Sequence, residues 1–251
     1  MQSKAIQLLR QMTNNPSAEF HDGQYDAIHE LVANTRKMLV VQKTGWGKSA
    51  VYFISTKLLR EAGKGPTIII SPLIALMRNQ ILSASKLRLN VVTINSSLDK
   101  TEREANEQKI ISQKADAILI SPEQLANDRF VENVLSRVLS NIGLFVVDEA
   151  HCISDWGHDF RPDYQRIVRI IQAMPKNLPV LATTATANNR VVSDIQQQLG
   201  KDMLTVRGAL MRESLKLQCV PQMFQAERLT CVASTLPQLK HTGIFYAKTT
   251  R

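Results

Sequence analysis

Short apolar runs alternate with longer amphipathic segments along most of the chain. The apolar runs occupy residues 38–41, 67–70, 91–94, 117–120, 144–147 and 179–182. Apolar residues at helical spacing occur in the segments between them, at 49–60, 73–87, 100–113, 123–140, 164–174 and 188–199. Strands this short and apolar are typical of a parallel sheet covered by helices on both faces. The alternation therefore predicts a doubly wound α/β fold.

The pattern changes after residue 207. A strand at 215–220, a helix at 227–239 and a further strand at 243–246 are predicted in the remaining segment. One or two strands cannot bury their own faces, so this segment either supports the first domain or begins a second one. We expect one domain at 1–207, with a helical segment at its N-terminus, and a linker with the start of an incomplete second domain at 208–251.

The segment 42–49, QKTGWGKS, follows the first apolar run and precedes a helix. A glycine-containing loop at a helix N-terminus aims backbone N–H groups at phosphate oxygens. Lys48 would then reach the β- and γ-phosphates and Ser49 would ligate Mg²⁺. Gln42 replaces the first glycine of the strict GxxxxGK[ST] pattern, so an ordinary helix start is the alternative. The candidate nucleotide-binding residues of this loop are Thr44, Gly45, Trp46, Gly47, Lys48 and Ser49.

Two carboxylates follow the apolar run at 144–147, in the sequence DEAH. Unpaired charge at the end of a buried strand is unfavourable, so Asp148 and Glu149 require partners. Asp148 is a suitable helix cap, but the upstream GKS favours a role in catalysis. In that interpretation Asp148 holds Mg²⁺ and Glu149 activates the attacking water. His151 would link this site to its neighbours through the hydroxyls of Thr184 and Thr186.

Composition narrows the possible partners. The chain has 31 Lys and Arg against 22 Asp and Glu, a formal net charge of +9, which suggests an anionic partner such as nucleic acid. The three cysteines, Cys152, Cys219 and Cys231, are not at metal-ligand spacing and indicate reduced thiols in a cytoplasmic protein. Neither a signal peptide nor a membrane-spanning run is expected, because the apolar runs are too short.

Several segments together resemble the RecQ family of superfamily 2 helicases. The most specific is 148–164, DEAHCISDWGHDFRPDY, which is similar to the family's DEAH box and the aromatic-rich loop after it. Segments 71–80 (SPLIALMRNQ), 95–97 (NSS), 120–125 (ISPEQL) and 182–187 (ATTATA) resemble its motifs Ia, Ib, Ic and III. The sequence FHDGQ at 20–24 resembles the adenine-recognition motif, and GIFYAKTTR at 243–251 resembles the opening strand of the second motor domain.

The resemblance implies a RecA-like P-loop domain with a mostly parallel sheet flanked by helices, followed by the start of a second RecA-like domain. It implies ATP and Mg²⁺ as cofactors, and 3′ to 5′ unwinding of DNA, with single-stranded or tailed duplex DNA as the partner. Gln24 would recognise adenine, and Ser71 and Arg78 would contact DNA phosphates, although a polar helix face is the alternative for these two. The loop that couples DNA binding to hydrolysis would carry Trp156, His158, Phe160 and Arg161.

The chain also departs from the family pattern. Trp46 stands where the phosphate loop of the family has glycine, and GALMRESLKL at 208–217 only loosely resembles the usual linker. The motifs of the second motor domain, including its arginine for the γ-phosphate, are not in the sequence. Two other functions therefore stay open at this point: a nucleic-acid translocase that does not separate strands, and a truncated module that binds nucleotide and DNA with little ATP hydrolysis.

Overall fold

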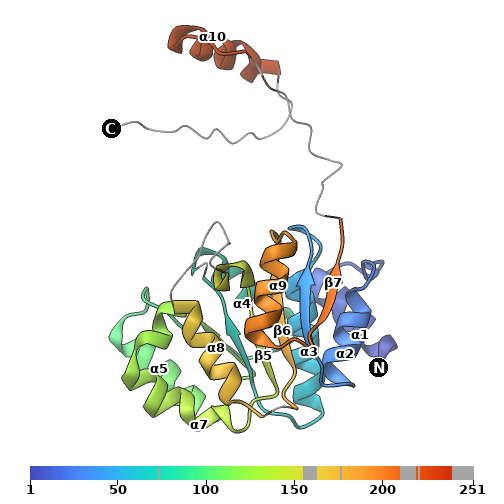
Figure 1. Cartoon of the computed structure of the whole chain (residues 1–251), viewed down its shortest axis with the longest axis vertical. Helices are drawn as coiled ribbons and strands as arrows, with labels where there is room; N and C mark the ends of the chain where they lie inside the picture. Colours follow the sequence, from blue (N-terminus) through green and yellow to red (C-terminus); the bar gives the residue numbers. More distant parts are fainter. Residues whose placement is uncertain (73, 155–162, 176, 210–218, 220, 239–251) are drawn as a thin grey trace. The chain divides into compact units, whose positions relative to one another are not determined.

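A parallel β-sheet forms the centre of the computed structural model (Figure 1). In the part of the chain that the structure describes, the strands are β1 (Lys37–Val41), β2 (Thr67–Ile70), β3 (Val91–Ile94), β4 (Ala117–Ile120), β5 (Leu144–Val147), β6 (Val180–Thr184) and β7 (Leu204–Arg207). Their order is β3-β4-β2-β5-β6-β1-β7, and every pairing is parallel. The doubly wound α/β prediction is confirmed, and the six predicted strands are all present. The edge strand β7 was not predicted.

Successive residues of the central strands point into two separate cores. On β1, Leu39 and Val41 belong to one apolar cluster, whereas Met38 and Val40 belong to the other. The second cluster is covered by α1 (Gln2–Thr13), α2 (Gln24–Val32), α3 (Lys48–Glu61) and α4 (Ile74–Lys86). The first is covered by α5 (Lys100–Ile111), α8 (Asp163–Ala173), α9 (Asn189–Leu199) and the short helices between β4 and β5. Burial on both faces explains why the inner strands are uniformly apolar.

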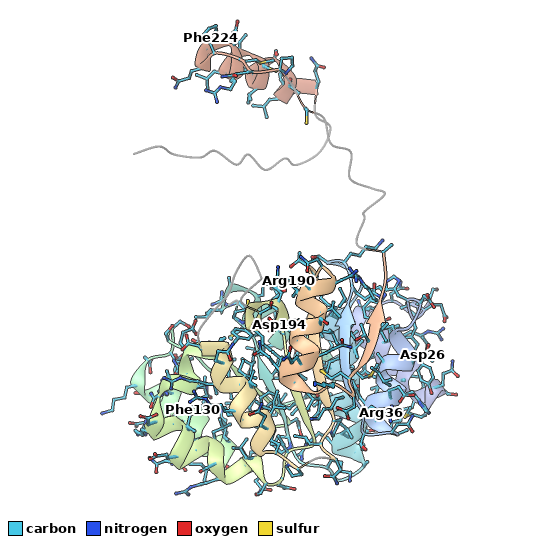
Figure 2. The ribbon with its side chains drawn as sticks, viewed as in Figure 1. Asp26, Arg36, Phe130, Arg190, Asp194 and Phe224 are labelled. Atoms are coloured by element: carbon cyan, nitrogen blue, oxygen red, sulfur yellow. The ribbon has the colours of Figure 1, made fainter. Side chains whose placement is uncertain are left out.

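The predicted helix at 123–140 is wrong as a single element. The segment consists of a 3₁₀ turn at Pro122–Ala126, α6 (Asp128–Phe130), a π-helical turn at Val131–Leu135 and α7 (Ser136–Leu139). Asn127 causes the first break, because its backbone is extended and its Oδ1 accepts a hydrogen bond from the Phe130 N–H at 3.1 Å. Phe130, labelled in Figure 2, is fully buried just after this break.

The structure describes residues 1–72, 74–154, 163–175, 177–209, 219 and 221–238. The chain divides into two compact units, Met1–Met211 and Arg212–Arg251. The described part of the second unit contains α10 (Gln225–Thr235) and the turn Leu236–Gln238, and none of their residues is buried. Phe224, which precedes α10, is 83% exposed (Figure 2). The predicted strand at 243–246, and all of the one at 215–220 except residue 219, lie outside the described residues. None of the described helices has the length and apolar character needed to span a membrane.

Candidate nucleotide-binding site

The loop between β1 and α3 has the backbone conformation of a phosphate-binding loop. Gly45 and Gly47 both have φ +89°, in the left-handed region that favours glycine. Gly47 is the N-cap of α3, which begins at Lys48. The loop therefore places the N-terminus of α3 at the site, where backbone N–H groups and the positive end of the helix dipole favour an anion.

Gln24, the first residue of α2, is buried beside this loop. Its Nε2 donates to the carbonyl oxygens of Trp46 at 3.3 Å and Gly47 at 3.1 Å, and its Oε1 accepts from the His21 N–H at 3.1 Å. A Cβ atom on Gly47 would lie 2.7 Å from Gln24 Nε2. Glycine at position 47 thus serves both the left-handed turn and the close approach of the glutamine.

The Lys48 ammonium lies against the carbonyl groups at the start of the loop. Its Nζ donates to the Gln42 carbonyl oxygen at 2.7 Å and is 3.4 Å from that of Lys43. Lys48 also lines the cavity in front of the loop. Neutral carbonyl oxygens therefore hold the ammonium at the site. Phosphate oxygens are charged, so they would bind the ammonium more strongly and take the place of these carbonyl groups.

Asp148 lies directly after β5 and is held by β6, by α4 and by the backbone of the next residue. Because Val147 pairs with Ala182, the next residue of β6, Thr183, lies beside Asp148. The Thr183 hydroxyl donates to Asp148 Oδ1 at 2.6 Å, the Glu149 N–H donates to the same oxygen at 3.1 Å, and Gln80 Nε2 of α4 donates to Oδ2 at 3.3 Å. Burial raises the pKa of Asp148 above its usual value, and the Glu149 charge adds to the rise, while the Thr183 hydrogen bond opposes it.

Glu149 and His151 form a second polar cluster next to Asp148. Glu149 is in the left-handed region with φ 52° and ψ 46°, which is uncommon for a residue other than glycine and typical of functional sites. Its Oε2 lies 3.2 Å from His151 Nδ1, which also lies 3.0 Å from the Thr184 hydroxyl. Burial lowers the pKa of His151, but the contacts with Cys152 and the Glu149 carboxylate outweigh it and raise the pKa to about 9.

The Thr184 hydroxyl continues this chain of contacts. It accepts from the Thr186 N–H at 3.1 Å and lies 3.2 Å from the Thr186 carbonyl oxygen. Thr184 is buried and Thr186 is exposed. The cluster therefore connects the carboxylate of Glu149 to the segment that follows β6.

A cavity of about 310 Å³ is lined by the phosphate loop and by Lys48, Ser49, Asp148 and Glu149. Ser49 and Asp148 both line its wall. Their hydroxyl and carboxylate oxygens are of the kind that Mg²⁺ prefers as ligands. Among the described residues there is no group of three His, Cys, Asp or Glu side chains that could hold a metal by itself. Phosphate oxygens and water would thus complete the coordination of Mg²⁺ here. The cavity is lined by Thr44, Gly45, Gly47, Lys48, Ser49, Tyr52, Leu76, Asn79, Gln80, Ser83, Asp148 and Glu149.

Some predicted residues lie elsewhere. Trp46 is 6% exposed and packs in the apolar cluster on the α1–α4 face, not on the cavity wall. Ser71 is buried at the end of β2, and Arg78 is exposed on α4. Trp156, His158, Phe160 and Arg161 lie outside the described residues.

Sequence reasoning missed three side chains of the site: Tyr52, Gln80 and Thr183. Tyr52 and Gln80 belong to helices whose apolar spacing was recognised, and position 80 lies four residues after Leu76 on one helix face, a spacing that the sequence does show. Thr183 is next to Asp148 only through the pairing of β5 with β6, which no local pattern reveals.

Comparison with known proteins agrees with this geometry. A model of the DEAD/DEAH box helicase family matches residues 21–195. The ATP-dependent DNA helicase RecQ of Haemophilus influenzae is 32% identical over 228 residues, which are 90% of this chain and 35% of the relative. The RecQ-like DNA helicase BLM of Xenopus laevis is 33% identical over 222 residues, or 85% of this chain and 16% of that protein.

A solved structure supports the fold. The crystal structure of a hypothetical ATP-dependent RNA helicase from Sulfolobus tokodaii superposes with a TM-score of 0.60 at 20% identity, over 83% of this chain and 57% of that one. The chain spans less than half of the length of these curated relatives, between 16% and 45%. On the family match over 21–195, the chain belongs to the DEAD/DEAH box helicases, and the relatives that it matches are RecQ-type DNA helicases.

Proposed function

We propose that this chain is the ATP-binding motor portion of a RecQ-type DNA helicase, which couples ATP hydrolysis to 3′ to 5′ translocation on DNA and to its unwinding. The observation that carries the proposal is the convergence of Lys48 and Ser49 with Asp148 and Glu149 on one cavity. These residues come from two loops about 100 positions apart, at the carboxyl ends of β1 and β5. In this proposal residues 1–207 form the first RecA-like domain, and 208–251 form a linker and the start of a second.

The loop, Lys48, Ser49, Asp148 and Glu149 of the cavity, together with Gln24 beside the loop, have parts in hydrolysis. The N–H groups of the loop and the Lys48 ammonium bind the phosphates, while Ser49 and Asp148 hold Mg²⁺. Mg²⁺, when bound, neutralises charge on the β- and γ-phosphate oxygens. The Glu149 carboxylate accepts a proton from the attacking water, and Gln24 reads the adenine ring next to the loop.

Contacts beyond the cavity link hydrolysis to DNA. His151 joins Glu149 to Thr184 and so to the exposed Thr186. In the proposal this path, together with Trp156, His158, Phe160 and Arg161, reports DNA binding to the catalytic carboxylate. Arg78, which is exposed on α4, contacts DNA phosphates in this proposal, whereas Ser71 is buried and would have to become accessible to do so. The net charge of +9 supports a polyanionic partner, and free cysteines support a reducing, cytoplasmic setting.

The test compares two lysines of the same helix. Lys48→Ala removes the ammonium at the cavity, and Lys57→Ala removes one further along α3 that pairs with Glu61. Loss of a charged partner from a phosphate costs about 2–5 kcal/mol of binding, so Lys48→Ala should abolish binding of a fluorescent ATP analogue at micromolar concentrations, while Lys57→Ala should retain it.

In the full-length protein Lys48→Ala should also abolish DNA-stimulated hydrolysis and strand displacement on a 3′-tailed duplex. Retained binding and hydrolysis in Lys48→Ala would refute the proposal. Hydrolysis without strand displacement in the unaltered protein would instead indicate a translocase.

A further inference from the structure

Gln80 of α4 joins two other elements at the wall of the nucleotide cavity. Its Nε2 donates to Oδ2 of Asp148, the residue after β5, at 3.3 Å. The same nitrogen donates to the Tyr52 hydroxyl of α3 at 3.0 Å. An ionised carboxylate only accepts hydrogen bonds, so Asp148 fixes the amide with its nitrogen toward the carboxylate. Gln80 lines the cavity together with Asn79 of the same helix.

The carbonyl end of the same amide has no partner. Gln80 Oε1 is buried and accepts no hydrogen bond from any described residue. Buried acceptors in folded proteins are almost always satisfied, and an exception calls for an explanation such as a missing ligand or ion. This oxygen is buried and Gln80 lines the cavity, so a donor that enters with the ligand would satisfy it.

Asp148 has one acceptor position left, and that position is next to Gln80. A carboxylate offers about four lone-pair positions. Among the described residues, Oδ1 accepts from the Thr183 hydroxyl and the Glu149 N–H, and Oδ2 accepts from Gln80. The free position is therefore on Oδ2, so a cation at Asp148 binds through the oxygen that Gln80 holds.

We propose that Gln80 is a positioning residue for the divalent cation of this site: Nε2 fixes Asp148 Oδ2, and Oε1 accepts a hydrogen bond from a water molecule bound to the cation. The inference rests on the proposed function, because it requires a magnesium nucleotide in the cavity. Mg²⁺ keeps several waters when proteins bind it, and outer partners of this kind change metal affinity by about 10–100-fold. Gln80 thereby connects α4, the helix that carries Arg78, to the cation.

Two substitutions separate the acceptor from the donor end of the amide. Gln80→Met keeps the length of the side chain and removes both ends, whereas Gln80→Glu removes the donor and keeps an acceptor oxygen. Both lose the hydrogen bond from Nε2 to Asp148, whereas the Tyr52 hydroxyl can donate to the carboxylate of Gln80→Glu. If Gln80 only braces Asp148, both substitutions should raise the Mg²⁺ midpoint alike. Asn79→Asp in the Gln80→Met background adds negative charge to the lining of the same cavity without replacing the acceptor, and so controls for general attraction of Mg²⁺.

The measurement is the affinity of the 251-residue chain for a fluorescent ATP analogue, titrated with Mg²⁺ and repeated in EDTA. Gln80→Met should raise the half-saturating Mg²⁺ concentration about 10-fold, a larger change than that of the affinity in EDTA, and circular dichroism checks that the variant folds. Gln80→Glu should return the midpoint to the value of the unaltered chain or below it. Asn79→Asp should not restore it.

Three results would overturn the inference. They are an unchanged Mg²⁺ midpoint in Gln80→Met, a Gln80→Glu midpoint no lower than that of Gln80→Met, and restoration by Asn79→Asp equal to that by Gln80→Glu. Failure of the proposed function has a separate signature, because the unaltered chain would then bind no analogue with or without Mg²⁺. That result would overturn both.

Discussion

The phosphate loop offers a matched pair of glycines that isolates the contribution of Gln24. Gly45 and Gly47 have the same φ of +89°, but a Cβ on Gly45 meets nothing within 4 Å, whereas one on Gly47 lies 2.7 Å from Gln24 Nε2. Alanine in the left-handed region costs about 1–2 kcal/mol per residue. Gly45→Ala should therefore show the backbone cost alone, and Gly47→Ala should add the displacement of Gln24.

The additional cost follows from the contacts of Gln24. Its amide donates to two loop carbonyls, and the side chain is 1% exposed, so displacement leaves buried polar groups unsatisfied. Such groups cost about 1–3 kcal/mol, and 1 kcal/mol lowers the Tm of a domain of this size by about 2–4 °C. Thermal unfolding followed by circular dichroism should place Gly47→Ala about 2–12 °C below Gly45→Ala.

The same reasoning predicts non-additivity. In a Gln24→Ala background the added methyl group of Gly47→Ala meets no amide, so the two glycine substitutions should destabilise equally. Equal Tm values for Gly45→Ala and Gly47→Ala in the unaltered background would refute the view that Gln24 braces the loop.

Two further predictions concern the carboxylates and their neighbours. Thr183→Val removes a hydrogen bond that favours ionised Asp148 and so raises the pKa of Asp148 further. The affinity for Mg²⁺ in the presence of nucleotide should fall about 10-fold, and the loss should grow as the pH is lowered. A loss independent of pH would contradict this. The pKa of His151 is raised to about 9 from 6.5, so charged His151 stabilises the fold fully below pH 6.5, and this stabilisation is lost as the pH rises through 9. His151→Gln should therefore lose on the order of 2 kcal/mol of unfolding free energy at pH 6 and little at pH 9.5; equal losses in urea unfolding at both values would show that the charge contributes nothing.

The parts of the fold that the sequence predicts are those whose burial is uniform. The strands β2, β4 and β5 are buried along their whole length, so their apolar runs are unbroken. β7 alternates half-buried and exposed residues at the sheet edge, where it pairs with β1 alone, and Thr205 and Arg207 interrupt its apolar pattern. The break at Asn127 was hidden because the apolar spacing continues across it.

The site divides in the same way. Lys48, Asp148 and Glu149 each follow a strand within a few residues, so sequence order and the carboxyl-edge rule together place them. Thr183 and Gln80 reach Asp148 through strand pairing and helix packing, which are properties of the assembled fold. The interpretation of Trp46 as a nucleotide contact used only its place in the loop, whereas its large apolar side chain is stabilised by burial in the core.

The position of β7 has a mechanical consequence. Its last residue is followed by Gly208, whose N–H donates to the Val41 carbonyl oxygen at 3.1 Å, and whose missing side chain makes room for the Gln42 amide, 2.2 Å from where a Cβ would lie. Gln42 in turn offers its carbonyl oxygen to Lys48. A displacement of Gly208 would therefore reach Lys48 through a single intervening residue, Gln42.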